Sequence, residues 1–211
     1  MTVKEYIKQN LNVPNALTVV RLLLVPVYVV LFVLGKKDPA LIVFLIACLT
    51  DFLDGQIARR FNLITDFGKL MDPLADKVMV LTAMLSMATG NPGAGIDPVI
   101  SWVAVVILLM KEAVMVVGGF AMYKHGIVVF SSLIGKVAHT VFIAGLVAVY
   151  FHRELQDAFP GWFLTPDLIL VWLAVGLTLC ALAFYVTSSI RQAMKLGIIK
   201  SKKGKPEGSR R

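Results

Sequence analysis

The stretch DFLDGQIARRFNLITDFGKLMDPLADK, from Asp51 to Lys77, places Asp51, Asp54, Asp72 and Asp76 in a chain that is otherwise strongly apolar. At about 100° per residue, Asp51 and Asp54 share one face of a helix, and Asp72 and Asp76 share one face of the next. Two facing helices would bring these four carboxylates into one small volume. Unit charges about 4 Å apart interact by roughly 4 kcal/mol at an effective dielectric of about 20, so we expect divalent cations to compensate the cluster.

The composition surrounding this cluster predicts an all-α, polytopic membrane protein. The chain has 211 residues, of which 58% are hydrophobic and only 16% are charged. Six apolar runs approach the roughly 20 residues that a helix needs to cross a bilayer. We expect membrane spans near residues 16–34, 40–59, 68–89, 98–123, 132–151 and 167–190.

The formal net charge of +8 is unevenly distributed along the chain, which predicts its orientation. If both termini are cytoplasmic, most of the 21 lysines and arginines lie on the inner side, and only Lys36, Lys37 and Arg153 lie outside. This asymmetry satisfies the positive-inside rule. We therefore expect a multi-pass protein of the cell membrane whose aspartate cluster faces the cytoplasm.

The sequence patterns at the two ends of the chain predict contacts with the membrane surface. The spacing of Val3, Tyr6 and Ile7 indicates a short amphipathic helix on the inner interface. Residues 200–211 are basic and nearly free of apolar side chains, which is typical of a disordered tail attracted to anionic lipids rather than to nucleic acid. We expect one transmembrane domain over residues 1–199, followed by this tail.

The aspartates belong to a longer pattern of fixed residues, Asp51-x2-Asp54-Gly55-x2-Ala58-Arg59-x8-Gly68-x3-Asp72-x3-Asp76. This pattern resembles the complete signature of the CDP-alcohol phosphotransferase family. Two neighbouring stretches resemble the phosphatidylglycerophosphate synthase branch of that family: Pro14-Asn15-x-Leu17-Thr18-x2-Arg21 and Met71-Asp72-Pro73-x-Ala75-Asp76-Lys77.

The resemblance implies a transferase that moves the phosphatidyl group of CDP-diacylglycerol to sn-glycerol 3-phosphate, releasing CMP. It implies that Asp51, Asp54, Asp72 and Asp76 form a site for two Mg²⁺ ions, or Mn²⁺ in their place, since hard cations prefer oxygen ligands. Asp76 would also be the general base that takes the proton of the acceptor hydroxyl. The resemblance further implies a homodimer embedded in membrane lipids.

A nucleotide site is expected beside the metals, because the small side chains of Gly55 and Ala58 let a ligand approach the helix backbone. Asn15 and Thr18 are expected to bond the cytosine or the ribose. The expected nucleotide site comprises Asn15, Thr18, Asp51, Gly55, Ala58 and Arg59.

Basic residues within the spans are candidates for binding the phosphate of the acceptor. Lys111 lies mid-span, where an ionisable group is costly and usually faces a partner or a wet cavity. Adjacent helical residues point about 100° apart, which favours this role over a local pair with Glu112. Arg21 is expected to contact either the substrate or the aspartates, and His139 to make a polar contact within the bundle. The expected acceptor pocket comprises Lys111, Lys136, Arg191 and Arg21.

Several alternatives remain open at this stage. The aspartates could form ion pairs with Arg59, Arg60, Lys69 and Lys77, although helical phase leaves only Arg59 and Lys69 well placed. The acceptor could be phosphatidylglycerol, as in cardiolipin synthesis, an inositol phosphate or a small amino alcohol. This follows from two departures from the branch pattern: Lys111-Glu112 replaces an Arg-Glu pair, and His139 precedes Thr140 after Gly135-Lys136.

Two other classes of protein also use acidic residues in a membrane. A cation transporter would bind its ion near the midplane at broken helices or repeat interfaces, whereas these acids cluster toward one face and no inverted repeat is apparent. A prenyl transferase would bind a diphosphate through Mg²⁺ and aspartates. The exact spacing that includes Gly55, Ala58 and Arg59 favours a CDP-linked substrate instead.

Overall fold

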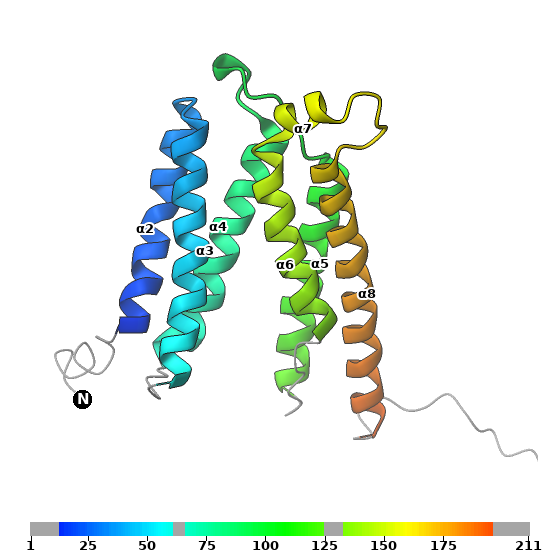
Figure 1. Cartoon of the computed structure of the whole chain (residues 1–211). Helices are drawn as coiled ribbons and strands as arrows, with labels where there is room; N and C mark the ends of the chain where they lie inside the picture. The colour runs from blue at the N-terminus through cyan, green and yellow to red at the C-terminus, as the bar shows by residue number, and fades with distance from the viewer. Residues whose placement is uncertain (1–12, 61–65, 125–132, 196–211) are drawn as a thin grey trace, which may run out of the picture.

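The protein is described by a computed structural model over residues 13–60, 66–124 and 133–195 (Figure 1). Within these ranges the chain is all-α, as predicted, and its only β-type pairing is an isolated bridge between Asn91 and Ile96. The elements are α2 (Val13–Val33), α3 (Lys37–Arg60), α4 (Asp66–Thr89), η1 (Pro92–Ala94), α5 (Trp102–Lys124), α6 (Leu133–Val149), α7 (His152–Ala158) and α8 (Pro166–Lys195).

A glycine ends α4 and turns the chain into the short segment that carries η1. Gly90 has φ 64°, in the left-handed region, and its N–H donates to the Ser86 carbonyl oxygen at 2.8 Å. A Cβ at this position would lie 2.6 Å from the carbonyl oxygen of Ile96. Only glycine therefore fits this turn, which leads the chain from α4 into η1.

Four of the described helices are long and apolar enough to cross a membrane. These spans are Asn15–Val33, Lys37–Ile57, Trp102–Gly119 and Pro166–Gln192. Many of their large apolar side chains are exposed, as suits contact with lipid; Leu23 is 63% and Val117 is 68% exposed. The chain is therefore a membrane protein.

The predicted number of six spans is not confirmed. A fifth span results if α6 and α7, which are bent by 80° relative to each other, are counted together. The remaining expected span corresponds to α4, whose amino-terminal half carries charged side chains that lower its hydropathy, Asp72, Asp76 and Lys77 among them. The charges that mark the candidate site thus explain why α4 is not among these four spans.

The long helices form two groups (Figure 1). In the first, α2 packs closely against α3 and α4; in the second, α8 packs against α6 and α5. Contacts of α4 with α5 and α6 join the groups and are far fewer. The first group carries all four aspartates, and the second carries Lys111 and Lys136.

Near the end of the bundle opposite the aspartates, buried contacts hold the two groups to each other and hold the helices of the second group together. The hydroxyls of Tyr28 on α2 and Tyr150 after α6 share a hydrogen bond of 2.6 Å, and both side chains are almost fully buried. In the second group, a Cβ on Gly145 would lie 3.2 Å from both the backbone nitrogen and a methyl carbon of Val171, so glycine allows α6 to approach α8 closely.

The amphipathic helix expected around Val3, Tyr6 and Ile7 and the tail expected at 200–211 lie outside the described residues. The division into a domain over residues 1–199 and a tail stays a prediction.

Candidate active site

The four aspartates lie on two neighbouring helices at one end of the bundle. Asp51 and Asp54 are close to the end of α3, and Asp72 and Asp76 are in the first turns of α4. The start of α2 lies at the same end (Figure 1). Each pair has the spacing of about one helical turn, so its two carboxylates point to the same side of the helix.

The guanidinium of Arg21, on α2, lies between the two carboxylates of α3. Its Nη1 is 3.0 Å from Oδ1 of Asp51, and its Nη2 donates a hydrogen bond to Oδ2 of Asp54. The side chains of Arg21 and Asp54 are 1% and 4% exposed, whereas that of Asp51 is 42% exposed. Charges this deeply buried are costly unless they are paired, so the triad ties α2 to α3 at the site.

Thr18, one turn before Arg21 on α2, donates a hydrogen bond from its hydroxyl to Oδ1 of Asp72. Asn15, one turn further toward the start of α2, is also buried. The two residues predicted to bind nucleotide therefore lie on the face of α2 that meets the aspartates. Gly55, directly after Asp54, is partly buried, and the side chains of Ala58 and Arg59 lie outside the described set.

The described side chains leave this region with an excess of negative charge. Three carboxylates, those of Asp51, Asp54 and Asp72, meet a single cation, Arg21, and the described hydrogen-bond donor to Asp72 is a neutral hydroxyl. The alternative of full ion pairing with nearby lysines gains no support from Lys77, which pairs with Glu112. The negative charge in excess thus favours the binding of a further cation in this region.

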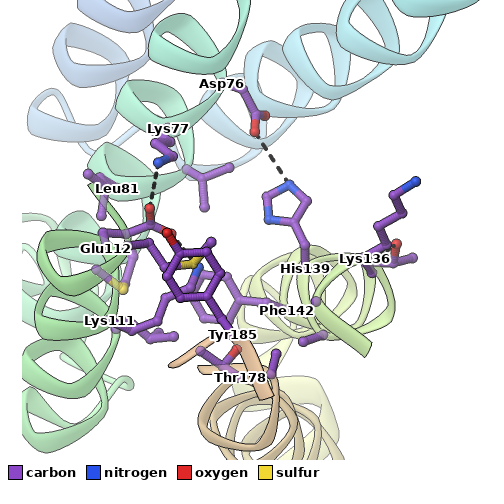
Figure 2. A pocket seen from close by; sticks show the side chains of 18 residues that line it. Asp76, Lys77, Leu81, Lys111, Glu112, Lys136, His139, Phe142, Thr178 and Tyr185 are labelled. Carbon is purple, nitrogen blue, oxygen red and sulfur yellow. Dashed lines mark hydrogen bonds and ion pairs between the residues drawn. The ribbon is translucent and has the colours of Figure 1, made fainter. Parts of the chain in front are cut away.

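Asp76 contacts the second helix group through α6. Its Oδ2 lies 3.4 Å from Nε2 of His139 on α6, the polar contact that was expected of this histidine (Figure 2). Asp76 also lines a cavity of about 430 Å³ between α4, α5, α6 and α8. The polar part of its wall consists of Asp76, Lys77, Lys111, Glu112, Lys136, His139, Thr140, Thr178 and Tyr185.

A carboxylate joins two lysines in the wall of this cavity. Oε2 of Glu112, on α5, is 2.6 Å from Nζ of Lys77 on α4, and its Oε1 pairs with Nζ of Lys111 (Figure 2). The expectation that Lys111 would not pair with its neighbour is wrong. Both side chains are long enough to bend toward each other, although their Cα–Cβ bonds diverge.

The residues expected to form the acceptor pocket do not all meet. Lys111 and Lys136 line the cavity, whereas Arg21 and Arg191 do not. Of the two roles expected for Arg21, the structure has the contact with the aspartates. Arg191 is exposed near the end of α8. Sequence reasoning missed Lys77 and Glu112 as a connected pair, because they lie on different helices.

The chemistry of the aspartates suits a divalent metal, although the described side chains are not assembled into a metal site. Four carboxylates supply the oxygen ligands that a hard cation prefers. Among the described residues, however, no three Asp, Glu, His or Cys side chains are arranged to hold an ion. The reason is visible in their contacts, since Arg21, Thr18 and His139 each engage one or two of the carboxylates. Binding of a metal ion by the aspartates would require some of these contacts to break.

Comparison with known proteins agrees with the pattern around the aspartates. The sequence model of the CDP-alcohol phosphatidyltransferase family matches residues 11–187. A protein of Bacillus subtilis named CDP-diacylglycerol–glycerol-3-phosphate 3-phosphatidyltransferase is 32% identical over 189 residues, covering 79% of this chain and 89% of its own length. A relative of the same name from Aquifex aeolicus is 35% identical over 66% of this chain and 79% of its own length.

A shorter and stronger similarity comes from a Rickettsia typhi protein of the same name. It is 49% identical over 80 residues, which are 35% of this chain and 44% of the relative. The match with this relative thus spans less than half of its length. The family as a whole is generally metal-dependent, in agreement with the carboxylate-rich site.

We predict that Arg21→Gln destabilises the protein and makes it more responsive to divalent cations. Removing one partner of a buried ion pair typically costs about 3–5 kcal/mol, and the partial exposure of Asp51 puts the expected loss at the lower end of that range. Added Mg²⁺ should recover more stability in the variant than in the wild type, because it can neutralise the freed carboxylates. Thermal unfolding in detergent, with chelator and with Mg²⁺, measures both effects.

The matched control is Arg153→Gln, which removes an exposed ion pair with Asp97 at the opposite end of the bundle. This change should alter neither stability nor the response to Mg²⁺. Equal Mg²⁺ stabilisation of the wild type and Arg21→Gln would contradict the view that Arg21 compensates charge at a cation site.

Proposed function

We propose that this chain, which belongs to the CDP-alcohol phosphatidyltransferase family, transfers the phosphatidyl group of CDP-diacylglycerol to sn-glycerol 3-phosphate. The products would be phosphatidylglycerol phosphate and CMP. Support for the acceptor comes from the names of the relatives and from the ammonium groups of Lys111 and Lys136 in the cavity wall.

The observation that carries the proposal is the position of Asp76 between two regions of opposite character. One helical turn before it on α4, Asp72 belongs to the acidic region with Asp51 and Asp54. Asp76 itself lines the cavity that holds the lysines. A diphosphate on the acidic side and a phosphorylated alcohol on the basic side would therefore meet at this carboxylate.

The acidic region would bind the diphosphate of the donor. We propose that Asp51, Asp54 and Asp72 are the main ligands of Mg²⁺, or of Mn²⁺ in its place, with Asp76 at the edge of the metal site; when bound, the metal supplies positive charge that stabilises the attacking and leaving oxygens. The nucleotide site would consist of Asn15 and Thr18 on the buried face of α2 and of Gly55, Ala58 and Arg59 on α3. Arg21 would hold the two α3 carboxylates in place.

Asp76 would act as the general base. The acceptor hydroxyl oxygen attacks the phosphorus that bears the diacylglycerol, and its proton passes to a carboxylate oxygen of Asp76. The bond between that phosphorus and the oxygen of CMP breaks, and CMP leaves with the bonding electrons. His139, 3.4 Å from Oδ2 of Asp76, would keep the carboxylate turned toward the cavity.

The site would face the cytoplasm, where CMP and glycerol 3-phosphate are water-soluble ligands. Basic residues of the described chain, including Arg60 at the end of α3 and Arg191 near the end of α8, are at the same helix ends as the aspartates. This distribution supports a cytoplasmic orientation by the positive-inside rule. The homodimer stays a prediction from the family resemblance.

The substrate assignment predicts that purified protein with Mg²⁺ releases CMP from CDP-diacylglycerol only when an acceptor is supplied. Among glycerol 3-phosphate, phosphatidylglycerol, inositol phosphate and a small amino alcohol, the first should give the highest kcat/KM. A coupled assay for CMP, with and without EDTA, makes the measurement. A clear preference for another acceptor would replace the assigned substrate, and a rate insensitive to EDTA would remove the metal from the reaction.

The assigned roles also predict that two conservative substitutions on α4 have separable effects. Asp72→Asn should weaken metal-dependent binding of CDP-diacylglycerol, because it removes a charged ligand. Asp76→Asn should keep much of that binding and lower kcat by about 10²–10⁴-fold, the usual contribution of a general base. Calorimetry of nucleotide binding beside a rate assay separates the two. Near-normal turnover by Asp76→Asn at neutral pH would show that another group takes the proton.

A further inference from the structure

We infer that Glu112 is a positioning residue that holds Lys77 and Lys111 together as a binding site for the phosphate of the acceptor. The inference rests on the proposed function and adds two residues, Lys77 and Glu112, to the acceptor side of the site. It starts from one carboxylate that bridges two helices: Oε2 of Glu112 lies 2.6 Å from Nζ of Lys77 on α4, and Oε1 pairs with Nζ of Lys111 on α5.

The partial burial of Lys111 and Glu112 requires a reason. The side chains of Lys111 and Glu112 are only 22% and 24% exposed, and that of Lys77 is 42% exposed. Lysines near a membrane surface tend to extend their ammonium groups toward water, and two neighbouring ammonium groups repel each other. The carboxylate removes this repulsion and keeps both ammonium groups at the wall of the cavity.

The triad can still bind another anion. An ammonium group has three N–H donors, and the contact with Glu112 engages only one carboxylate oxygen per lysine. The remaining donors are available to a phosphate, and the triad as a whole carries one net positive charge. Lys136 on α6 lines the same cavity and adds a further positive charge.

The position of the triad relative to Asp76 gives the pairing a function in the reaction. Lys77 directly follows Asp76 on α4, and both line the cavity together with Lys111 and Glu112 (Figure 2). A short acceptor would then find a partner for each of its ends on this wall. The lysines would bind its phosphate, and Asp76 would accept the proton of its hydroxyl. Fixing the lysines thus helps to orient the hydroxyl toward Asp76.

The test compares steady-state kinetics of the wild type, Glu112→Gln, Lys77→Met and the double variant. Glu112→Gln keeps the size of the side chain but removes its charge, and it should raise KM for glycerol 3-phosphate by about tenfold or more, as for loss of a charge-assisted contact. KM for CDP-diacylglycerol should change little. Because Glu112 acts by holding Lys77 beside Lys111, Glu112→Gln should have a smaller effect in the Lys77→Met background, where only the pair with Lys111 is left to lose. Glu112→Asp, which retains the charge, should recover part of the affinity.

Asp97→Asn serves as the control, since it removes the exposed ion pair with Arg153 at the other end of the bundle and should leave both KM values unchanged. A lower KM for glycerol 3-phosphate in Glu112→Gln would overturn the inference, because the carboxylate would then compete with the phosphate. Equal changes in both KM values, accompanied by lower thermal stability, would also overturn it and leave Glu112 as a structural link between α4 and α5.

Binding of inorganic phosphate, measured by calorimetry, separates failure of this inference from failure of the proposed function. If the wild type does not use glycerol 3-phosphate, the proposed function is contradicted, but the triad can still be tested. Weaker phosphate binding by both Glu112→Gln and Lys77→Met supports the inference. Unchanged phosphate affinity in the two variants overturns it.

Discussion

A guanidinium buried between two carboxylates is the interaction on which the candidate site depends. Arg21 lies well inside α2, where a charge is tolerated only with close partners, and Asp51 and Asp54 of α3 supply them. The same contact brings Thr18, one turn earlier, to Asp72 of α4. Three helices are thus held together by polar groups at one end of an otherwise apolar bundle. Among the described side chains, one cation does not balance three carboxylates, and this imbalance favours the binding of further positive charge at this end of the bundle.

The arrangement of helices separates the two halves of the proposed reaction. Helices α2, α3 and α4 provide the acidic region, whereas α5 and α6 bring lysines to the cavity. Within the described ranges, α4 makes few contacts with α5 and α6, and the pairs of Asp76 with His139 and of Lys77 with Glu112 join the two groups at this end. Asp76 and Lys77, which are consecutive on α4, therefore connect the groups at the place where CDP-diacylglycerol and glycerol 3-phosphate would meet in the proposed mechanism.

Local spacing predicted the helical class and the placement of the aspartates on two helices, because both follow from the period of a helix. It did not predict the contacts that determine the chemistry. The pairs Thr18–Asp72, Arg21–Asp54 and Lys77–Glu112 join residues 54, 33 and 35 positions apart, and only tertiary packing decides them. The pairing of Lys111 with Glu112 was missed for another reason. Helical phase fixes only the direction of the Cα–Cβ bond, and the rotamers of a long side chain can bring its end to an adjacent residue.

In the proposed mechanism, divalent cations neutralise the excess negative charge of the α3 and α4 carboxylates during catalysis. Electron paramagnetic resonance of Mn²⁺ with the purified protein and a CDP-linked nucleotide measures this binding without relying on turnover. We expect about two bound ions per chain, as in two-metal phosphoryl-transfer sites, with fewer in Asp51→Asn and Asp72→Asn. Absence of bound Mn²⁺ in the wild type, or equal binding by the wild type and both variants, would contradict it.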